Sequence, residues 1–250
     1  MSRGSAEACG CFPTGRHYPG IAHLLRAVIR GIADEFVSDT PWSEIPIALL
    51  DVETTGRDAS KDRVVEVGIA VGKNGSVIAR YNWLINPGIP ISEESRAVHH
   101  ISDDDVKDSP RFEGIAHEIA TALEGCVPAA YNAAFDRAFL ANEFARIPGH
   151  GQSGAKLPPG LRRDVDWVDP LVWAREIQRA EKSKALAEVA SRLGVKLERA
   201  HRASDDAEAA LLVLFALGAD ARVPRTYGAM IQEQRRLALL QADERRFWKN

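Results

Sequence analysis

The sequence is poor in cysteine and has no long apolar run. Three cysteines among 250 residues cannot build a disulfide framework, so we expect a reducing compartment. No stretch approaches the roughly 18 consecutive apolar residues of a membrane span, and the first ten residues lack the apolar region of a signal peptide. These absences predict a cytoplasmic protein without membrane association.

The sequence also lacks a strong charge of either sign. Its 32 Lys and Arg residues oppose 35 Asp and Glu residues, a formal net charge of −3, which taken alone disfavours a nucleic acid partner. A hydrophobic fraction of 45% and a charged fraction of 27% are ordinary for a globular protein and exclude collagen-like and globally disordered classes. The length suits one substantial domain with appendages.

The first forty residues differ from those that follow. Residues 1–20 are rich in Gly, Ser and Pro and show no periodicity, which is typical of a tail. An apolar stripe at helical spacing then predicts an amphipathic helix, with members Ile21, Leu24, Leu25, Val28, Ile29, Ile32 and Phe36. This helix would pack on the main core or dock on a partner. We assign residues 1–43 to this tail and helix.

Residues 44–220 have the pattern of an α/β domain. Apolar runs predict strands at 47–53, 64–71 and 76–85, with Asn74-Gly75 as a hairpin turn, and shorter strands at 127–131 and 165–168. Helical patterns are expected at 112–123, 135–146, 171–179, 185–193 and 204–217. This order predicts a mixed sheet flanked by helices. A basic tail, 221–250, would form a helix that folds back on the core or binds a partner.

Two acids stand at the end of the first strand. Asp51 and Glu53 are two residues apart, so strand geometry places both carboxylates on one face. Adjacent acids repel each other unless a cation neutralises them, and Mg²⁺ prefers such oxygen ligands. The turn at Thr54-Thr55-Gly56 would let the backbone approach a ligand. A solvated strand end is the commoner explanation of such a pair taken alone.

Two further segments place acids at predicted helix starts. Asp136 ends the run Tyr131-Asn-Ala-Ala-Phe-Asp136, in the first turn of a helix. In the second segment Ser204 is a predicted N-cap, with Asp205 and Asp206 in the first turn and His201 on the preceding loop. A histidine that titrates near neutral pH is a natural general base for a metal-bound water. Each segment alone has an ordinary explanation as a capped helix start.

Together the three segments resemble the motifs of the DEDD 3′→5′ exonucleases, in the branch that contains a motif histidine and includes the proofreading epsilon subunit of bacterial DNA polymerase III. Leu50–Gly56 resembles the first motif and Asn132–Asp136 the second. His201 and Asp206, separated by four residues, fit the third motif, whereas Asp205 does not. The resemblance covers residues 45–217. His100 departs from it, because relatives commonly have Gly there.

The resemblance implies a ribonuclease-H-like fold and a two-metal active site. Two divalent ions, Mg²⁺ or Mn²⁺, would be held by Asp51, Glu53, Asp136 and Asp206, and His201 would take a proton from the attacking water. The 3′-terminal nucleotide would be cradled by the five residues Thr54, Thr55, Gly56, Asn132 and Phe135. Discounting the four metal-binding acids leaves a nearly neutral remainder, so net charge is a poor guide to the partner.

The sequence leaves several alternatives open. The leading hypothesis is an exonuclease acting on single-stranded 3′ ends of DNA, with a polymerase or another replication or repair protein as a possible partner. An enzyme acting on RNA is the closest rival, since no motif reads the 2′-hydroxyl. A non-catalytic adaptor is the rival from another class. A basic cluster before the third motif is either a solvated face or a phosphate-contacting flank, and comprises Lys182, Lys184, Arg192, Lys196, Arg199 and Arg202.

Overall fold

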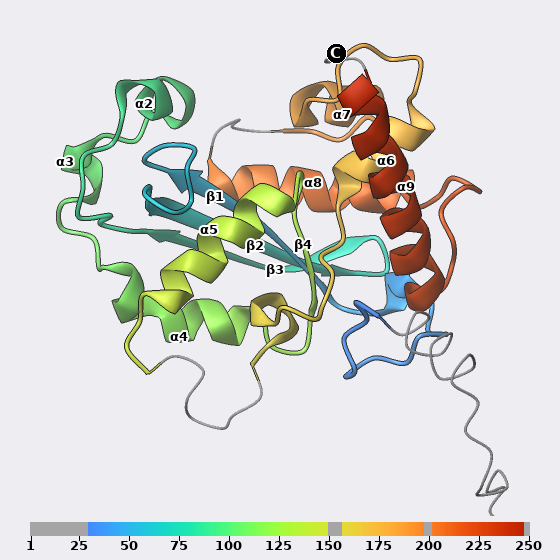
Figure 1. Cartoon of the computed structure of the whole chain (residues 1–250), viewed down its shortest axis with the longest axis horizontal. Helices are drawn as coiled ribbons and strands as arrows, with labels where there is room; N and C mark the ends of the chain where they lie inside the picture. Colours follow the sequence, from blue (N-terminus) through green and yellow to red (C-terminus); the bar gives the residue numbers. More distant parts are fainter. Residues whose placement is uncertain (1–29, 150–156, 198–201, 248–250) are drawn as a thin grey trace, which may run out of the picture.

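The sheet is mixed, as predicted, and has four strands among the described residues. The computed structural model describes residues 30–149, 157–197 and 202–247 (Figure 1). The strands lie in the order β3-β2-β1-β4. β1 pairs in parallel with β4, while β2 is antiparallel to both β1 and β3. The strand bounds are β1 (Ile47–Thr54), β2 (Val64–Lys73), β3 (Ser76–Leu84) and β4 (Val127–Ala129).

The helices surround this sheet and follow the predicted order. α2 and α3 lie at one end of the described fold, and α6, α7 and α9 gather at the other (Figure 1). The bounds of the described helices are η1 (Trp42–Glu44), α2 (Glu93–His99), α3 (Asp103–Val106), α4 (Phe112–Ala122), α5 (Ala134–Ala145), η2 (Pro159–Leu161), α6 (Pro170–Ile177), α7 (Leu186–Arg192), α8 (Ala203–Leu217) and α9 (Tyr227–Phe247). Among these helices, none is long and apolar enough to cross a membrane.

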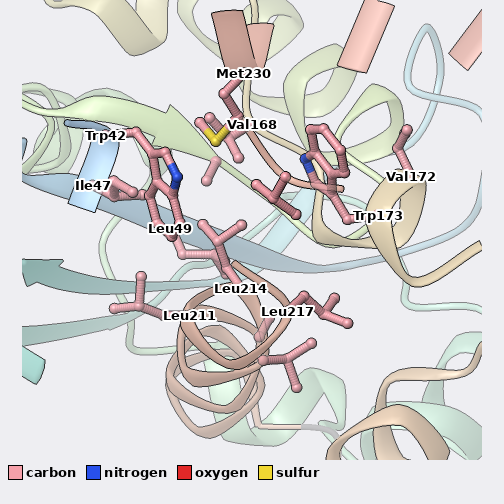
Figure 2. Close-up of a cluster of buried hydrophobic side chains, with 14 of the residues drawn as sticks. Trp42, Ile47, Leu49, Val168, Val172, Trp173, Leu211, Leu214, Leu217 and Met230 are labelled. Carbon is pink, nitrogen blue, oxygen red and sulfur yellow. The ribbon is translucent and has the colours of Figure 1, made fainter. Parts of the chain in front are cut away.

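Alternation along β1 divides the core into two layers. Ile47 and Leu49 belong to the cluster that contains the apolar residues of α8 and α6, including Leu214 and Trp173 (Figure 2). Ala48, Leu50 and Val52 belong to a second cluster, with Phe112 and Ile119 of α4 and Phe139 and Leu140 of α5. Because successive strand residues point to opposite faces, the odd-numbered residues of β1 face α8. Asp51 and Glu53 continue that series.

The start of α8 differs from the prediction. Arg202, not Ser204, is the N-cap residue, and Ser204 lies inside the helix without a capping hydrogen bond. The physical reason is an acceptor supplied from the sheet: the backbone N–H of Ala203 donates to a carboxylate oxygen of Glu66 on β2, at 3.2 Å. A partner outside the helix satisfies this first N–H, so the helix begins two residues earlier than a cap at Ser204 would place it.

The predicted strand at 165–168 forms only single bridges, from Val165 to Gly31 and from Val168 to Ala129. The carbonyl of Trp167 and the following N–H of Asp169 instead bind a side chain of α9. Gln234 accepts from the N–H of Asp169 at 2.8 Å and donates to the carbonyl of Trp167 at 2.9 Å. The Gln234 side chain thus supplies hydrogen bonds that a neighbouring strand would supply in a longer ladder. The prediction of a regular strand here is therefore wrong.

The predicted N-terminal helix falls mostly outside the described residues. Residues 30–36 are described and are not helical. Gly31 has φ +83°, a left-handed conformation that cannot continue an α-helix. Ile32 and Phe36 nevertheless pack against the core, and Tyr227 of α9 accepts a hydrogen bond from the N–H of Ala33. Within residues 30–36 the apolar spacing therefore identified partly buried residues but not a helix.

Replacing Gln234 by Ala is expected to lower the free energy of unfolding by about 2–3 kcal/mol, because it leaves two backbone polar groups without their partner. Urea unfolding followed by circular dichroism measures the change. Leu239→Ala is the control, since that side chain on the same helix is 70% exposed and should cost less than about 0.5 kcal/mol. Equal effects of the two substitutions would contradict the role given to Gln234.

The backbone conformation of His100, the residue after α2, explains why Gly is the usual residue at this position in the family. His100 is the C-cap residue and has φ +59°, a left-handed conformation that suits Gly. We expect His100→Gly to raise the free energy of unfolding by about 0.5 kcal/mol, the gain from relieved strain being partly offset by the added freedom of the unfolded chain. Thermal unfolding compares it with His100→Ala, which keeps the Cβ. A similar gain from the alanine variant would refute the explanation.

Candidate active site

Three carboxylates converge where β1 meets α8. Asp51 and Glu53 point from β1 toward α8, and Asp206 lies in the first turn of that helix. One ligand oxygen from each residue lies within 4.8 Å of the others. Oxygen ligands on opposite sides of a Mg²⁺ ion are about 4.2 Å apart, since each bond is about 2.1 Å. The donor set and its spacing therefore fit a divalent cation after a small contraction.

The electrostatics of this group show the cost of keeping it ionised. Burial, followed by the negative charge of Asp136, holds the pKa of Asp51 well above its usual range. Burial and then the charge of Asp206 raise the pKa of Glu53 to about 8, and Arg202 opposes this shift only partly. Acids that resist ionisation because they repel one another are stabilised by a bound cation.

A fourth acid reaches the site from the opposite layer. β4 ends at Ala129, opposite Leu49, so the strand ladder does not extend to Val52. Asp136, in the first turn of α5, instead accepts a hydrogen bond from the N–H of Val52 at 3.1 Å. Its side chain is buried, and burial raises its pKa. Asp136 lies outside the three-carboxylate group but adjoins Asp51, whose pKa its charge raises.

The two neighbouring aspartates of α8 have different surroundings. Asp205 is buried and pairs with Arg80 of β3 at 2.6 Å, away from β1. Asp206 is the one that joins Asp51 and Glu53. The helical rotation of about 100° per residue thus assigns one acid to an ion pair and the other to the acidic group. His201, the predicted general base, lies outside the described residues.

Glu66 is a buried acid that the sequence motifs did not identify. It lies on β2 opposite Glu53 and accepts hydrogen bonds from Asn82 at 2.9 Å, from Arg202 at 2.7 Å and from the N–H of Ala203. These bonds attach the start of α8 to the sheet and therefore position Asp206. The available sequence signal was a glutamate inside the otherwise apolar run of residues 64–71.

Gly68 permits the close approach of α8 to β2. It lies opposite Asp51, and a Cβ at this position would be 2.1 Å from the carbonyl carbon of Ala203. Any larger residue would push the helix away from the sheet. Gly68 and Glu66 therefore act together: the glycine makes room for the helix start and the glutamate holds it.

Asp169 was likewise not assigned a role from the sequence. It caps α6 by accepting from the N–H of Leu171, and it also accepts from the N–H groups of Asn132 and Ala133 at 3.0 and 3.1 Å. Asn132 has φ +74°, a conformation that needs such external support. Asp169 thus fixes the turn that precedes Asp136. Its signal was weaker, because an Asp before Pro170 reads as an ordinary helix cap.

A cleft of about 620 Å³ opens beside Glu53. Four of the five predicted nucleotide-cradling residues line it, namely Thr54, Thr55, Gly56 and Phe135. Asn132 is exposed and is not part of this lining. His99 forms part of the wall: its Nδ1 accepts from the N–H of Ile101, so its Nε2–H donates to the carbonyl of Thr54 at 3.2 Å. This bond joins the end of β1 to α2.

The fold and site together define a ribonuclease-H-like α/β protein with a carboxylate site at the end of its central strand. The profile of the RNase_T family, described as Exonuclease, matches residues 49–214. The chain belongs to this exonuclease family.

Relatives show how this domain is used elsewhere. The chain is 33% identical over 173 residues to a PolC-type DNA polymerase III of Lacticaseibacillus paracasei, covering 69% of this chain and 11% of the polymerase. It is 29% identical over 160 residues to the 3′-5′ exonuclease DinG of Staphylococcus saprophyticus, covering 64% of this chain and 17% of that protein. The chain thus matches only a small part of the length of these relatives.

Solved structures share the fold at low sequence identity. Exonuclease X in complex with 5′ overhanging duplex DNA superposes with a TM-score of 0.56 at 21% identity, covering 74% of this chain and 99% of that one. A 3′-exonuclease that recognises the histone mRNA stem-loop superposes with a TM-score of 0.55 at 15% identity, covering 70% and 83%. At these identities the likeness shows the fold alone.

Glu66→Gln tests how α8 is positioned. A neutral amide pairs weakly with Arg202, so Asp206 should be held less firmly and Mn²⁺ affinity, measured by titration calorimetry, should fall about 10-fold. Asp205→Asn is the matched control. It also removes a carboxylate from the first turn of α8, but one that pairs with Arg80. An Mn²⁺ affinity that is unchanged in Glu66→Gln, or reduced equally in both variants, would contradict the assignment.

Proposed function

We propose that this chain is a metal-dependent 3′→5′ exonuclease that removes nucleotides from the 3′ end of DNA. The observation that carries the proposal is the convergence of Asp51, Glu53 and Asp206, with Asp136 adjoining, in a member of the exonuclease family. A non-catalytic adaptor would have no need of a cluster whose charges raise one another's pKa.

The roles of the acids follow from their positions. Asp51, Glu53 and Asp206 would hold one divalent ion, and Asp51 together with Asp136 would support a second. When bound, Mg²⁺ or Mn²⁺ supplies a water of lowered pKa and stabilises charge on the attacking and leaving oxygens. His201, adjacent in sequence to the anchored Arg202, accepts the proton of the attacking water. The water oxygen bonds to the phosphorus of the terminal phosphodiester, and the bond from that phosphorus to the 3′ oxygen of the preceding nucleotide breaks. The departing oxygen takes a proton from solvent, which leaves a 3′-hydroxyl end and a free 5′-mononucleotide.

The cleft beside Glu53 receives the terminal nucleotide. Thr54, Thr55 and Gly56 contribute polar backbone next to the acids, and Phe135 offers an aromatic face for the base. Asn132 contributes from the exposed turn before α5. Residues 44–220 form the exonuclease domain, with 1–43 and 221–250 as extensions.

DNA is the substrate that the relatives favour, because the PolC-type protein is a DNA polymerase. RNA is the second candidate, supported by the fold shared with the 3′-exonuclease that recognises histone mRNA. We place the protein in the cytoplasm, where a polymerase or another replication or repair protein would be its partner.

Digestion of end-labelled substrates tests the function. Single-stranded DNA, mismatched duplex DNA and short RNA, each labelled at the 5′ end, are incubated with Mg²⁺, Mn²⁺ or EDTA. We expect a ladder of DNA products that shortens from the 3′ end, and no product with EDTA. Equal digestion with EDTA would contradict the two-metal proposal, and faster digestion of RNA would favour the second candidate.

The substitution Asp51→Asn tests whether metal binding and hydrolysis can be lost while the fold is retained. Removing one of the mutually repelling acids should raise the melting temperature of the metal-free protein, while hydrolysis falls at least 1,000-fold, roughly the loss expected for a residue essential to electrostatic catalysis. Adding Mn²⁺ should stabilise the unsubstituted chain and have much less effect on the variant. Differential scanning calorimetry and the digestion assay measure the two effects. Unsubstituted rates in the variant would refute the role of Asp51.

A further inference from the structure

A second charged cavity lies between α6 and α9, outside the acidic site. It has a volume of about 530 Å³. Figure 1 shows these helices together at the end of the fold opposite α2 and α3. The lining comprises four cationic side chains, two carboxylates and one amide, contributed by Arg175, Arg179, Lys184, Arg245, Glu176, Glu244 and Gln241. α9 lies beyond the segment that matches the exonuclease family, so Gln241, Glu244 and Arg245 are contributed from outside that segment.

Two of its arginines form no ion pair within the part of the chain that the structure describes. Glu176 pairs with Arg179 at 2.9 Å. Among the described residues, by contrast, no carboxylate lies within ion-pair distance of Arg175 or Arg245. Burial and then the positive charge of Arg245 lower the pKa of Arg175, and Asp169 offsets this only in part. Two guanidinium groups in such proximity are stabilised by a bound anion.

The packing of the two helices holds these arginines in place. The Gln241 side chain on α9 donates to the carbonyl of Val172 on α6, at 2.9 Å. Arg245 is four residues beyond Gln241 and Arg175 is three beyond Val172, so each arginine lies on the same helix face as the neighbouring contact residue. One buried hydrogen bond therefore aligns the two faces that carry the charges.

The cavity is connected to the motif that carries Asp136. Asp169 caps α6 and also holds Asn132, and Arg175 is six residues further along that helix, about 9 Å at 1.5 Å per residue. Tyr131, which precedes Asn132, donates from its hydroxyl to the carbonyl of Lys184 at 2.6 Å. A strand that reaches from the active site to this cavity must therefore extend upstream of its terminal nucleotide.

We propose that Arg175 and Arg245, with Arg179 and Lys184, bind backbone phosphates of the substrate strand upstream of the 3′ end held in the active site. Guanidinium groups pair with phosphate oxygens in a bidentate manner, and the contact carries no sequence information. This inference rests on the proposed function for the direction of the strand. On this inference, α9 helps to bind substrate strands that are longer than a few nucleotides.

Binding of DNA oligonucleotides of two lengths tests the inference. The double variant Arg175→Gln/Arg245→Gln and the single variant Arg245→Gln are made in the inactive Asp51→Asn chain, and fluorescence anisotropy measures affinity for a 12-mer and a 3-mer. The control is Arg236→Gln, an arginine on α9 that pairs with Glu233 and does not line the cavity. We expect the double variant to bind the 12-mer about 10-fold more weakly and the 3-mer unchanged.

The salt dependence gives an independent readout. Loss of two phosphate contacts should reduce the slope of log affinity against log salt by about 1.4 for a single strand. An unchanged 12-mer affinity, or equal weakening for both lengths, would overturn the inference. Arg245 is exposed, so its single variant tests the idea even if the double variant is poorly folded.

The outcome is distinguishable from failure of the proposed function. If the unsubstituted chain fails to degrade DNA but binds the 12-mer through these arginines, the proposed function is wrong and the phosphate site stands. If it degrades DNA and the variants bind both lengths like the parent, the function stands and the phosphate site is wrong. In the active chain we expect the double variant to raise KM for the 12-mer about 10-fold at unchanged kcat.

Discussion

The site depends most on the hydrogen bonds that the buried carboxylate of Glu66 accepts from the start of α8. This carboxylate joins β2 to the start of α8 through Arg202 and the N–H of Ala203, while Gly68 removes the side chain that would keep the helix away. The same helix supplies Leu211, Leu214 and Leu217 to the core over β1 (Figure 2). One docking contact thus determines both the packing of a core layer and the distance from Asp206 to the acids of β1.

The acidic group illustrates the tension between stability and function. Asp51 and Glu53 lie at the end of a strand whose other residues are buried and mostly apolar, Asp136 adjoins them from α5, and burial raises the pKa of each acid. The fold tolerates this because the surrounding elements are independently anchored. Asp169 fixes the turn at Asn132, and the N–H of Val52 fixes the carboxylate of Asp136. His99 fixes the end of β1. The strain is concentrated where a cation would relieve it.

Helix α9 is part of the fold even though it lies beyond the segment that defines the family. Gln234 and Gln241 satisfy backbone groups at 167–172, and Tyr227, Met230 and Ile231 are buried in the core around α8 and α6. The helix therefore stabilises the segment that ends in Asp169 and, through it, the turn of the second motif. It also brings Arg245 to Arg175, which links the extension to the substrate path that we infer.

Local patterns in the sequence determined the strands, most helices and the acidic motifs, because alternation and helical periodicity record which face of an element is buried. The spacing of Asp51 and Glu53 on a strand was enough to place both on one face. Tertiary structure alone decided where α8 begins, since Glu66 is distant in sequence from Ala203. It also decided that residues 165–168 form no regular strand, that Asp205 pairs with Arg80 while Asp206 joins the cluster, and that α9 returns to α6. Each of these outcomes depends on contacts between residues far apart in the chain, which no local pattern of apolar and polar residues encodes.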